Sequence, residues 1–392
     1  MSLITLNLPA TAIMGAGARH ELPAQIKRLG ASHVLIVTDA FLRQTGLPDA
    51  LASTMREAGC TVTIFDQVQP DPTDQNVAAG LQIFRTHAAE KSGANVIVAV
   101  GGGSAIDCAK AISILATNPE PLRQYMGYHK VPLAGVPLIA IPTTAGTGSE
   151  ATRVAVITDT ERHEKMMILD ARLTPAVALV DYELSLSMPK PLTAHVGVDT
   201  LTHGIEAYVS KQANGMTDPM ALSCIALTAG ALLTAWAEPD NHMAREAMAL
   251  AAYQGGAAFT NASVCLVHGM SRPLGAVYHV PHGLSNAVLL PEVTRFSLSG
   301  APARYATIAR IMGLAGGEGS DEAAGHRLVD GLEALNETLQ IPPLRECVKV
   351  GRAKFDKSLE KMAHDALASG SPQNNPVVPT AEQIIELYRA AW

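Results

Sequence analysis

The chain has 392 residues, of which 48% are hydrophobic and 17% charged, so it can bury one large core or two smaller ones. Its formal net charge of −7 is modest, and no run of Lys and Arg indicates a nucleic-acid partner. The start MSLITLNLPATAIMG does not resemble a signal peptide, and no uninterrupted apolar stretch reaches the length of a membrane span. Five scattered Cys without a CxxC pair favour a reducing compartment, so we expect a cytoplasmic protein without a membrane partner.

The first half of the chain alternates apolar, β-branched runs with stretches of helical spacing. The runs predict strands at 33–39, 61–65, 95–100, 137–141, 154–158 and 177–181, and the spacing predicts a helix over 75–91. Continuous apolar strands separated by helices are typical of a parallel sheet covered on both faces. We therefore predict an α/β, Rossmann-like dinucleotide-binding domain over residues 1–187.

The second half is rich in Ala, Leu and Met and has few β-branched runs. Helices are expected at 218–237, 301–313, 321–340 and 380–391. The first of these is nearly all apolar and is expected to be buried. The last begins with Thr380 followed three residues later by Gln383, which is the pattern of a capping box. We therefore predict an all-α domain over residues 188–392.

Two loops that directly follow predicted strands are suited to hold phosphate groups. The first, GGGSAIDCAK (101–110), opens a helix, and its glycines let the backbone of the helix N-terminus approach an anion closely. The second, PTTAGTGSE (142–150), is dense in hydroxyls and small residues. A third segment, GAGARH (15–20), has the start of a dinucleotide fingerprint but lacks its third glycine, so we interpret it as the turn into a helix at 20–29.

Asp39 stands at the end of the first predicted strand. An acid there can bind the hydroxyls of an adenosine ribose and repel a 2′-phosphate. It is also a favoured residue for the N-cap of a helix. Both interpretations stay open on the residues alone.

Four side chains with nitrogen or oxygen donors form the most informative pattern. Asp199 and His203 are four residues apart, so on a helix they share one face. His268 and His282 follow fourteen residues apart in VHGMSRPLGAVYHVPHG. One carboxylate and three imidazoles suit Fe(II), Zn(II), Mn(II) or Co(II), with room for a substrate oxygen.

Together and in this order, GGGSAIDCAK, PTTAGTGSE, GVDTLTHGIEAY and VHGMSRPLGAVYHVPHG resemble the iron-containing (group III) alcohol dehydrogenases. The resemblance covers nearly the whole chain, is strongest to the lactaldehyde reductase (propanediol oxidoreductase) branch, and extends in fold to dehydroquinate synthases. It implies that Asp199, His203, His268 and His282 ligate Fe2+, or alternatively Zn2+. It also implies a dinucleotide, NAD rather than NADP, held by Asp39, Gly101, Gly102, Gly103, Ser104, Asp107, Thr143, Thr144, Thr147, Ser149 and Lys165.

The chain departs from that branch between the two ligand histidines. Where the branch usually reads VHGMAHPLGA, this chain has Arg272 in place of a His. Arg can grip a carboxylate or phosphate with two parallel bonds, or it can serve the structure by pairing with a nearby acid. His279 can replace the lost imidazole. We therefore take Arg272 and His279 as the candidate catalytic residues.

The resemblance implies reversible hydride transfer between an alcohol and NAD in a cleft between the two domains, with the metal as Lewis acid. Arg272 keeps open a reductase of an acidic aldehyde or maleylacetate-type substrate. A dehydroquinate synthase-like lyase would need more Lys and Arg than residues 192–300 offer. A homodimer or higher homo-oligomer is expected, with residues 1–14 as an extended arm that can pair across a two-fold axis.

Overall fold

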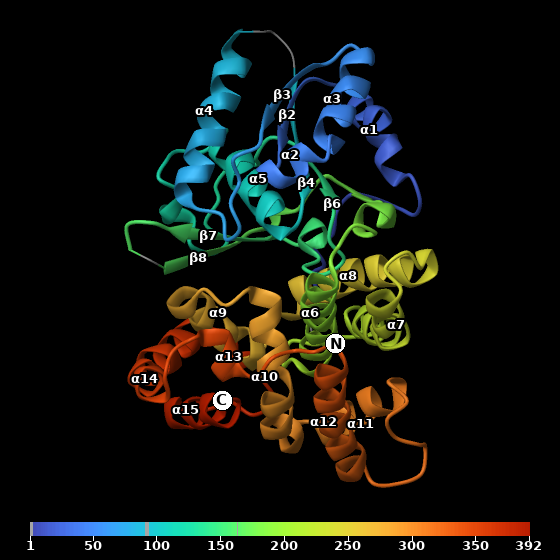
Figure 1. Cartoon of the computed structure of the whole chain (residues 1–392). Coiled ribbons are helices and arrows are strands. Elements are labelled where there is room, and N and C mark those ends of the chain that lie inside the picture. Colours follow the sequence, from blue (N-terminus) through green and yellow to red (C-terminus); the bar gives the residue numbers. More distant parts are fainter. Residues whose placement is uncertain (1–2, 91–93, 163) are drawn as a thin grey trace. The chain divides into compact units, whose positions relative to one another are not determined.

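The computed structural model describes residues 3–90, 94–162 and 164–392. They form two compact units, Asn7–Leu186 and Ser187–Trp392, and residues 3–6 belong with the second. The first unit carries the described strands and the second is helical (Figure 1). The predicted fold class, an α/β domain with a parallel sheet plus an all-α domain, is confirmed.

The first unit is built on a six-stranded sheet with the order β1-β9-β6-β4-β2-β3, and each of its recorded pairings is parallel. Its strands are β1 (Thr11–Met14), β2 (Ala31–Val37), β3 (Thr61–Phe65), β4 (Ala94–Gly101), β6 (Leu138–Pro142) and β9 (Val177–Val180). The chain goes from β2 outward to β3 and then returns past β2 to β4. The direction of winding therefore reverses between β2 and β4, and open α/β sheets bind ligands at the carboxyl ends of the strands on either side of such a reversal.

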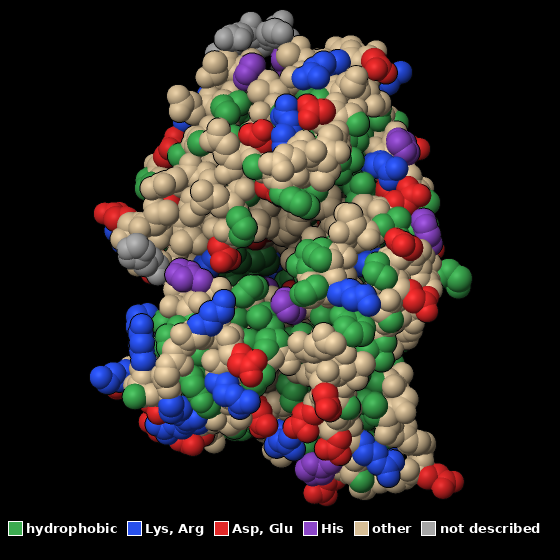
Figure 2. Space-filling view, viewed as in Figure 1, with side chains coloured by type: hydrophobic (Ala, Val, Ile, Leu, Met, Phe, Trp, Pro, Cys, Tyr) green, Lys and Arg blue, Asp and Glu red, His purple; other side chains and the backbone are tan. Residues whose placement is uncertain are grey.

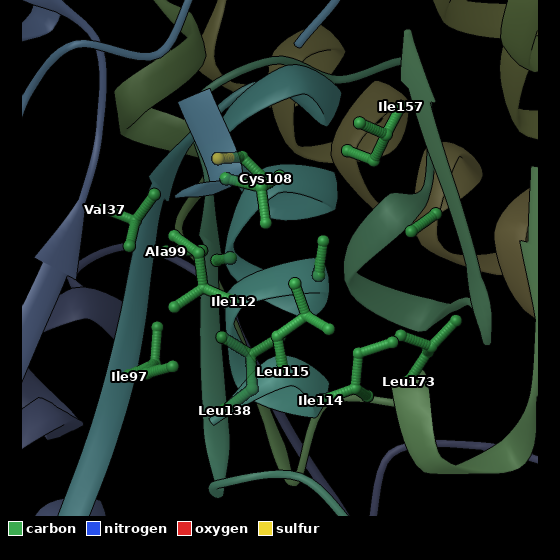
Figure 3. Packing of buried hydrophobic residues seen from close by; sticks show 14 of the residues in the cluster. Val37, Ile97, Ala99, Cys108, Ile112, Ile114, Leu115, Leu138, Ile157 and Leu173 are labelled. Atoms are coloured by element: carbon green, nitrogen blue, oxygen red, sulfur yellow. The ribbon is translucent and has the colours of Figure 1, made fainter. Parts of the chain in front are cut away.

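Helices cover both faces of this sheet, which explains why its strands are apolar throughout. The α-helices of the unit are α1 (Leu22–Arg28), α2 (Ala40–Gln44), α3 (Leu47–Glu57), α4 (Asp74–Glu90) and α5 (Gly103–Leu115), and the short 3-10 helices are η1 (Ala18–Glu21), η2 (Leu122–Tyr125), η3 (Ser149–Ala151), η4 (Ala171–Leu173) and η5 (Tyr182–Ser185). Along β4, Val96, Val98 and Val100 enter one core cluster, while Ile97 and Ala99 enter the other. Figure 3 shows the second cluster, in which Ile112 and Leu115 of α5 pack on the sheet.

The last two expected strands belong to different sheets. The expected strand at 177–181 is β9 and joins the main sheet, whereas 154–158 is β7 (Val154–Asp159) of a separate three-stranded sheet. There β7 pairs antiparallel with β8 (Glu164–Leu169), and β5 (Gly127–Tyr128) completes the sheet. The helix expected over 75–91 is α4, and residue 91 lies outside the described residues.

The second unit is a bundle of helices, and the capping box predicted at its last helix is confirmed by both hydrogen bonds between Thr380 and Gln383. The helices are α6 (Lys190–Val209), α7 (Asp218–Ala237), α8 (His242–Ala262), α9 (Leu266–Tyr278), α10 (His282–Ser297), α11 (Pro302–Ile311), α12 (Asp321–Thr338), α13 (Leu344–Val348), α14 (Arg352–Ala368) and α15 (Ala381–Ala390), with the short η6 (Leu298–Gly300) and η7 (Pro372–Asn374). α6 packs against α7, α8 and α10, and most of its residues are buried.

α7 corrects an expectation from the sequence. It is long and apolar enough to cross a bilayer by length and composition, although no such stretch was expected. Only 39% of its apolar window is buried, so the expectation of a buried helix is wrong for most of that window. It packs against α6 and α8 of its own unit, and core helices of soluble proteins share this length and composition.

Candidate metal centre and dinucleotide loops

The four predicted metal ligands come together within the helical unit. Asp199 and His203 lie one turn apart on α6, His268 lies in α9, and His282 is the first residue of α10. One ligand atom from each lies within 4.8 Å of every other. The backbone explains how residues fourteen apart meet: α9 ends at Tyr278, His279 takes a left-handed conformation, and the chain re-enters a helix at His282.

The distances suit one ion. From Asp199 Oδ1, the Nε2 atoms of His268, His203 and His282 lie 3.6, 3.7 and 3.9 Å away. Tetrahedral coordination with bonds of about 2.1 Å separates ligand atoms by roughly 3.4 Å, so small movements would close the set around a metal. The first three side chains are buried, whereas His282 is 44% exposed. The centre is therefore open to solvent beside His282.

Asn286, which no sequence pattern singled out, shows whether the surroundings of the four side chains suit a cation. Its amide Nδ2 lies 2.6 Å from Asp199 Oδ1, 3.1 Å from His268 Nε2 and 3.3 Å from His282 Nε2. Three ligand atoms thus converge on one hydrogen-bond donor with partial positive charge. A point that gathers acceptors in this way also suits a cation. Its place in the sequence is a signal, because residue 286 lies one helical turn after His282.

Burial keeps His268 in its neutral form. The pKa of His268 lies well below its usual value, first because the ring is desolvated and then because His203, which is stacked on it at 4.8 Å between ring centroids, is a potential cation. A neutral imidazole is the form that ligates a metal. Close packing supports this arrangement, since a Cβ at Gly255 of α8 would lie 3.3 Å from the Cβ of His203 and 3.0 Å from the Sγ of Cys224.

The two candidate catalytic residues differ in their surroundings. Arg272 lies one turn after His268 on α9 and donates to Ser371 Oγ at 2.8 Å. Its positive charge contributes to lowering the pKa of His268, so it lies within electrostatic reach of the centre. His279 is exposed and terminates α9 with φ of +56°. Neither observation assigns a catalytic role, and both roles stay predictions.

In the sheet unit, the structure brings the two predicted phosphate loops together. β4 and β6 are neighbours, and Thr143 N donates to Gly101 O at 3.0 Å. Gly101 has φ of +154°, and a Cβ there would lie 2.7 Å from the Cβ of Ala105, so the turn into α5 requires glycine. Ser104 follows within the first turn of α5.

The second loop packs against the other two glycines of the first. A Cβ at Gly102 would lie 3.4 Å from the Oγ1 of Thr144. A Cβ at Gly103 would lie 3.0 Å from the Cγ2 of Thr147. Both loops therefore meet at the N-terminus of α5, where a helix favours an anion.

Asp39 supports both of its interpretations at once. Its Oδ1 accepts the backbone N–H of Leu42 at 2.9 Å and so caps α2. Its Oδ2 lies 3.8 Å from the position of a Cβ at Gly101. Asp39 follows β2 and Gly101 ends β4, so the two flank the point where the winding of the sheet reverses.

Asp107 and Ser149 brace the loops through contacts inside the protein. Ser149 Oγ donates to Asp107 Oδ1 at 2.6 Å, and Val156 N donates to Oδ2 at 3.0 Å. The buried ammonium of Lys110 donates to Ser149 O at 2.8 Å, and burial lowers the pKa of Lys110 to about 8. Lys165 on β8 pairs with Asp71 at 2.8 Å. Contact of these side chains with a dinucleotide stays a prediction.

Comparison with known proteins agrees with this geometry. Residues 9–182 match the family model described as iron-containing alcohol dehydrogenase, and residues 193–392 match the model of the C-terminal part of the Fe-containing alcohol dehydrogenase family. The chain belongs to the iron-containing alcohol dehydrogenase family. It is therefore an oxidoreductase, and the resemblance inferred from its motifs is confirmed.

Relatives within the family span the whole chain. The chain is 41% identical to lactaldehyde reductase of Escherichia coli (strain K12) and 40% identical to NAD-dependent methanol dehydrogenase of Bacillus methanolicus, with 98% of each chain covered in both cases. The crystal structure of a 1,3-propanediol oxidoreductase matches with a TM-score of 0.95 and 38% identity over 100% of both chains. These matches favour an alcohol dehydrogenase over the acidic-aldehyde and lyase alternatives.

Proposed function

We propose that this chain transfers hydride reversibly between a small alcohol and NAD, with one divalent ion held by Asp199, His203, His268 and His282. The observation that carries the proposal is the convergence of these four side chains to within 4.8 Å in a member of this family. When bound, the ion would supply a Lewis acid that polarises the substrate oxygen. We propose Fe(II) as the ion and keep Zn(II) as the alternative, because three imidazoles and a carboxylate suit both.

In this proposal the helical unit binds the ion and the substrate, and the sheet unit binds the dinucleotide. In the helical unit, the Asp199 carboxylate offsets part of the charge of the ion, and the partly exposed His282 leaves a side on which a small substrate can enter. In the sheet unit, the N-terminus of α5 and the Gly101–Gly103 turn would hold the pyrophosphate. The Asp39 carboxylate would hold the adenosine ribose of NAD.

A panel of substrates tests the proposal. Chelator-treated protein is reloaded with Fe(II) or Zn(II), metal content is measured, and NADH absorbance is followed with short alcohols, diols, neutral aldehydes and aldehyde acids. We expect turnover of alcohols and neutral aldehydes that needs a stoichiometric ion. Full activity in metal-free protein, or no NAD(H) turnover with any compound, would overturn the proposal.

Asp39→Asn is expected to improve the use of NADP relative to NAD by about tenfold or more. Asn keeps the N-cap but removes the negative charge that faces a 2′-phosphate, and each 1.4 kcal/mol of relieved repulsion is worth about tenfold. The measurement is the ratio of kcat/KM for the two dinucleotides in Asp39→Asn and Asp39→Gly. Asp49→Asn, a change of equal charge at a half-exposed side chain, is the control. An unchanged ratio would leave Asp39 as a helix cap alone.

Arg272→Ala is expected to lower kcat/KM by the same factor for neutral and for anionic aldehydes, and to lower Tm. The reason is the hydrogen bond from Arg272 to Ser371, since a bond from a charged group contributes about 1.5–3 kcal/mol to stability. Ser371→Ala removes the same bond but keeps the positive charge, so it is the matched control. If Arg272→Ala lost activity toward aldehyde acids alone while Ser371→Ala kept it, Arg272 would bind the anionic group of the substrate.

A cytoplasmic location and a homodimer complete the proposal. The five Cys are free thiols, as a reducing compartment would keep them. β1 lies at an edge of the main sheet, and Leu8 before it and Met14 at its end are exposed, which suits pairing with a second copy. Charges of both signs are interspersed over the face seen in Figure 2, without the basic patch of a nucleic-acid-binding surface. Light scattering would measure the oligomeric state, and a monomer would contradict this part.

A further inference from the structure

We propose that Glu206 is the positioning residue of His268: it holds the ring with Nδ1 protonated and so directs the lone pair of Nε2 into the metal centre. The inference rests on the proposed function, because it assumes that this centre holds an ion. Glu206 does not reach the ligand atoms themselves. It acts through the ring of His268.

The side-chain carboxylate of Glu206 makes three hydrogen bonds among the described residues, all to the segment that carries His268. It lies on α6, one turn after His203, and is buried. Its Oε2 lies 2.6 Å from His268 Nδ1. The backbone N–H of Cys265 donates to Oε2 at 2.9 Å, and that of Val267 donates to Oε1 at 2.6 Å.

With Glu206 ionised, these contacts favour one tautomer of His268. Backbone N–H groups can only donate, so both oxygens of Glu206 serve as acceptors, and an ionised Glu206 can pair with Nδ1 of His268 only if Nδ1 donates its proton to Oε2. A neutral imidazole protonated at Nδ1 has its lone pair at Nε2. That is the atom that faces Asp199 Oδ1 at 3.6 Å.

The same carboxylate anchors the backbone that carries the ring. Cys265 is the N-cap of α9, so Glu206 binds free N–H groups of the helix N-terminus, where a negative charge is favoured. Glu206 therefore restrains both the imidazole and the start of its helix. Carboxylates behind a ligating histidine orient the ring, and their loss typically weakens metal binding by about 10–100-fold.

The test measures metal affinity rather than turnover. Co(II) is titrated into chelator-treated wild type and Glu206→Gln, and the dissociation constant and the Co(II) absorption spectrum are recorded. Gln has an amide of similar shape, but its N–H donors oppose Nδ1–H or a backbone N–H. We expect a dissociation constant about 10–100-fold higher and an altered spectrum. Glu206→Asp, whose shorter carboxylate cannot span all three donors, is measured in parallel and settles the matter if the Gln variant does not fold.

A double-mutant cycle separates positioning from simple destabilisation. His268→Ala and Glu206→Gln/His268→Ala should bind Co(II) with equally weakened affinity, measured at Co(II) concentrations high enough to detect it, because Glu206 has no ring left to orient. Ser320→Ala removes the N-cap of α12 in the same unit and is the control for lost capping, so its metal affinity should match that of wild type.

The outcomes distinguish the two levels of the proposal. If His268→Ala binds Co(II) as wild type does, the metal centre itself is wrong. If His268→Ala loses the ion while Glu206→Gln and Glu206→Asp keep wild-type affinity and spectrum, only the positioning role is wrong. Additive losses in the cycle would likewise reduce Glu206 to a cap of α9.

Discussion

His268→Ala is expected to remove the bound ion and to lower NAD-linked kcat/KM by about 1000-fold. His268 is buried and is one of the four proposed ligands, so the variant would leave only Asp199, His203 and His282 to hold the ion. A metal Lewis acid supplies several kcal/mol of stabilisation in the transition state, and each 1.36 kcal/mol is worth tenfold in rate. Metal analysis of the purified variant and steady-state kinetics are the two measurements.

His364→Ala is the control for this variant, because His364 is an exposed histidine of α14 in the same unit. It should keep wild-type metal content and activity. The metal role would be refuted by a folded His268→Ala protein that turns over substrate at the wild-type rate after stringent chelation.

Gly101→Ala is expected to weaken NADH binding by at least about 100-fold. Residue 101 has φ of +154°, and a Cβ would approach Ala105 to 2.7 Å, so the turn into α5 must move. The N–H groups at the start of α5 would then miss the pyrophosphate. Calorimetric titration with NADH measures the loss, and metal content should not change because the proposed metal ligands belong to the other unit.

Gly30→Ala separates this effect from backbone strain. Gly30 lies in the same unit with φ of +66° but has open space around its Cβ position. Alanine at positive φ costs about 1–2 kcal/mol, so Tm should fall while NADH affinity is kept. Wild-type NADH affinity in Gly101→Ala would show that the glycine turn does not hold the dinucleotide.

The four side chains that the sequence singled out as metal ligands do converge, but the residues that contact them were not predicted. The spacing of Asp199 and His203 places them on one helical face from local geometry alone. Their meeting with His268 and His282 depends on how α6, α9 and α10 pack, which spacing does not determine, and the family resemblance supplied that link. Asn286 lies four residues after His282 and Glu206 lies three residues after His203, so each is on the same helical face as a proposed ligand. Such spacings are common on any helix and did not single these residues out.

The fold followed the same rule. Apolar, β-branched runs predicted the strands, and the spacing of Thr380 and Gln383 predicted the capping box, because both signals depend on neighbours in the chain. The partner of β7 could not be predicted, since an antiparallel ribbon and a parallel strand use similar residues. The partial burial of α7 could not be predicted for a related reason. The sequence of an apolar helix is similar whether the helix packs on one side or on all sides.

Asn286 links three helices at one point. Its amide Nδ2 lies within hydrogen-bond distance of Asp199 on α6, His268 on α9 and His282 on α10. A substitution at residue 286 therefore reaches three of the four proposed ligands at once, although Asn286 is not one of them. Residues one helical turn from a ligand thus belong to the set that determines how the proposed centre is arranged.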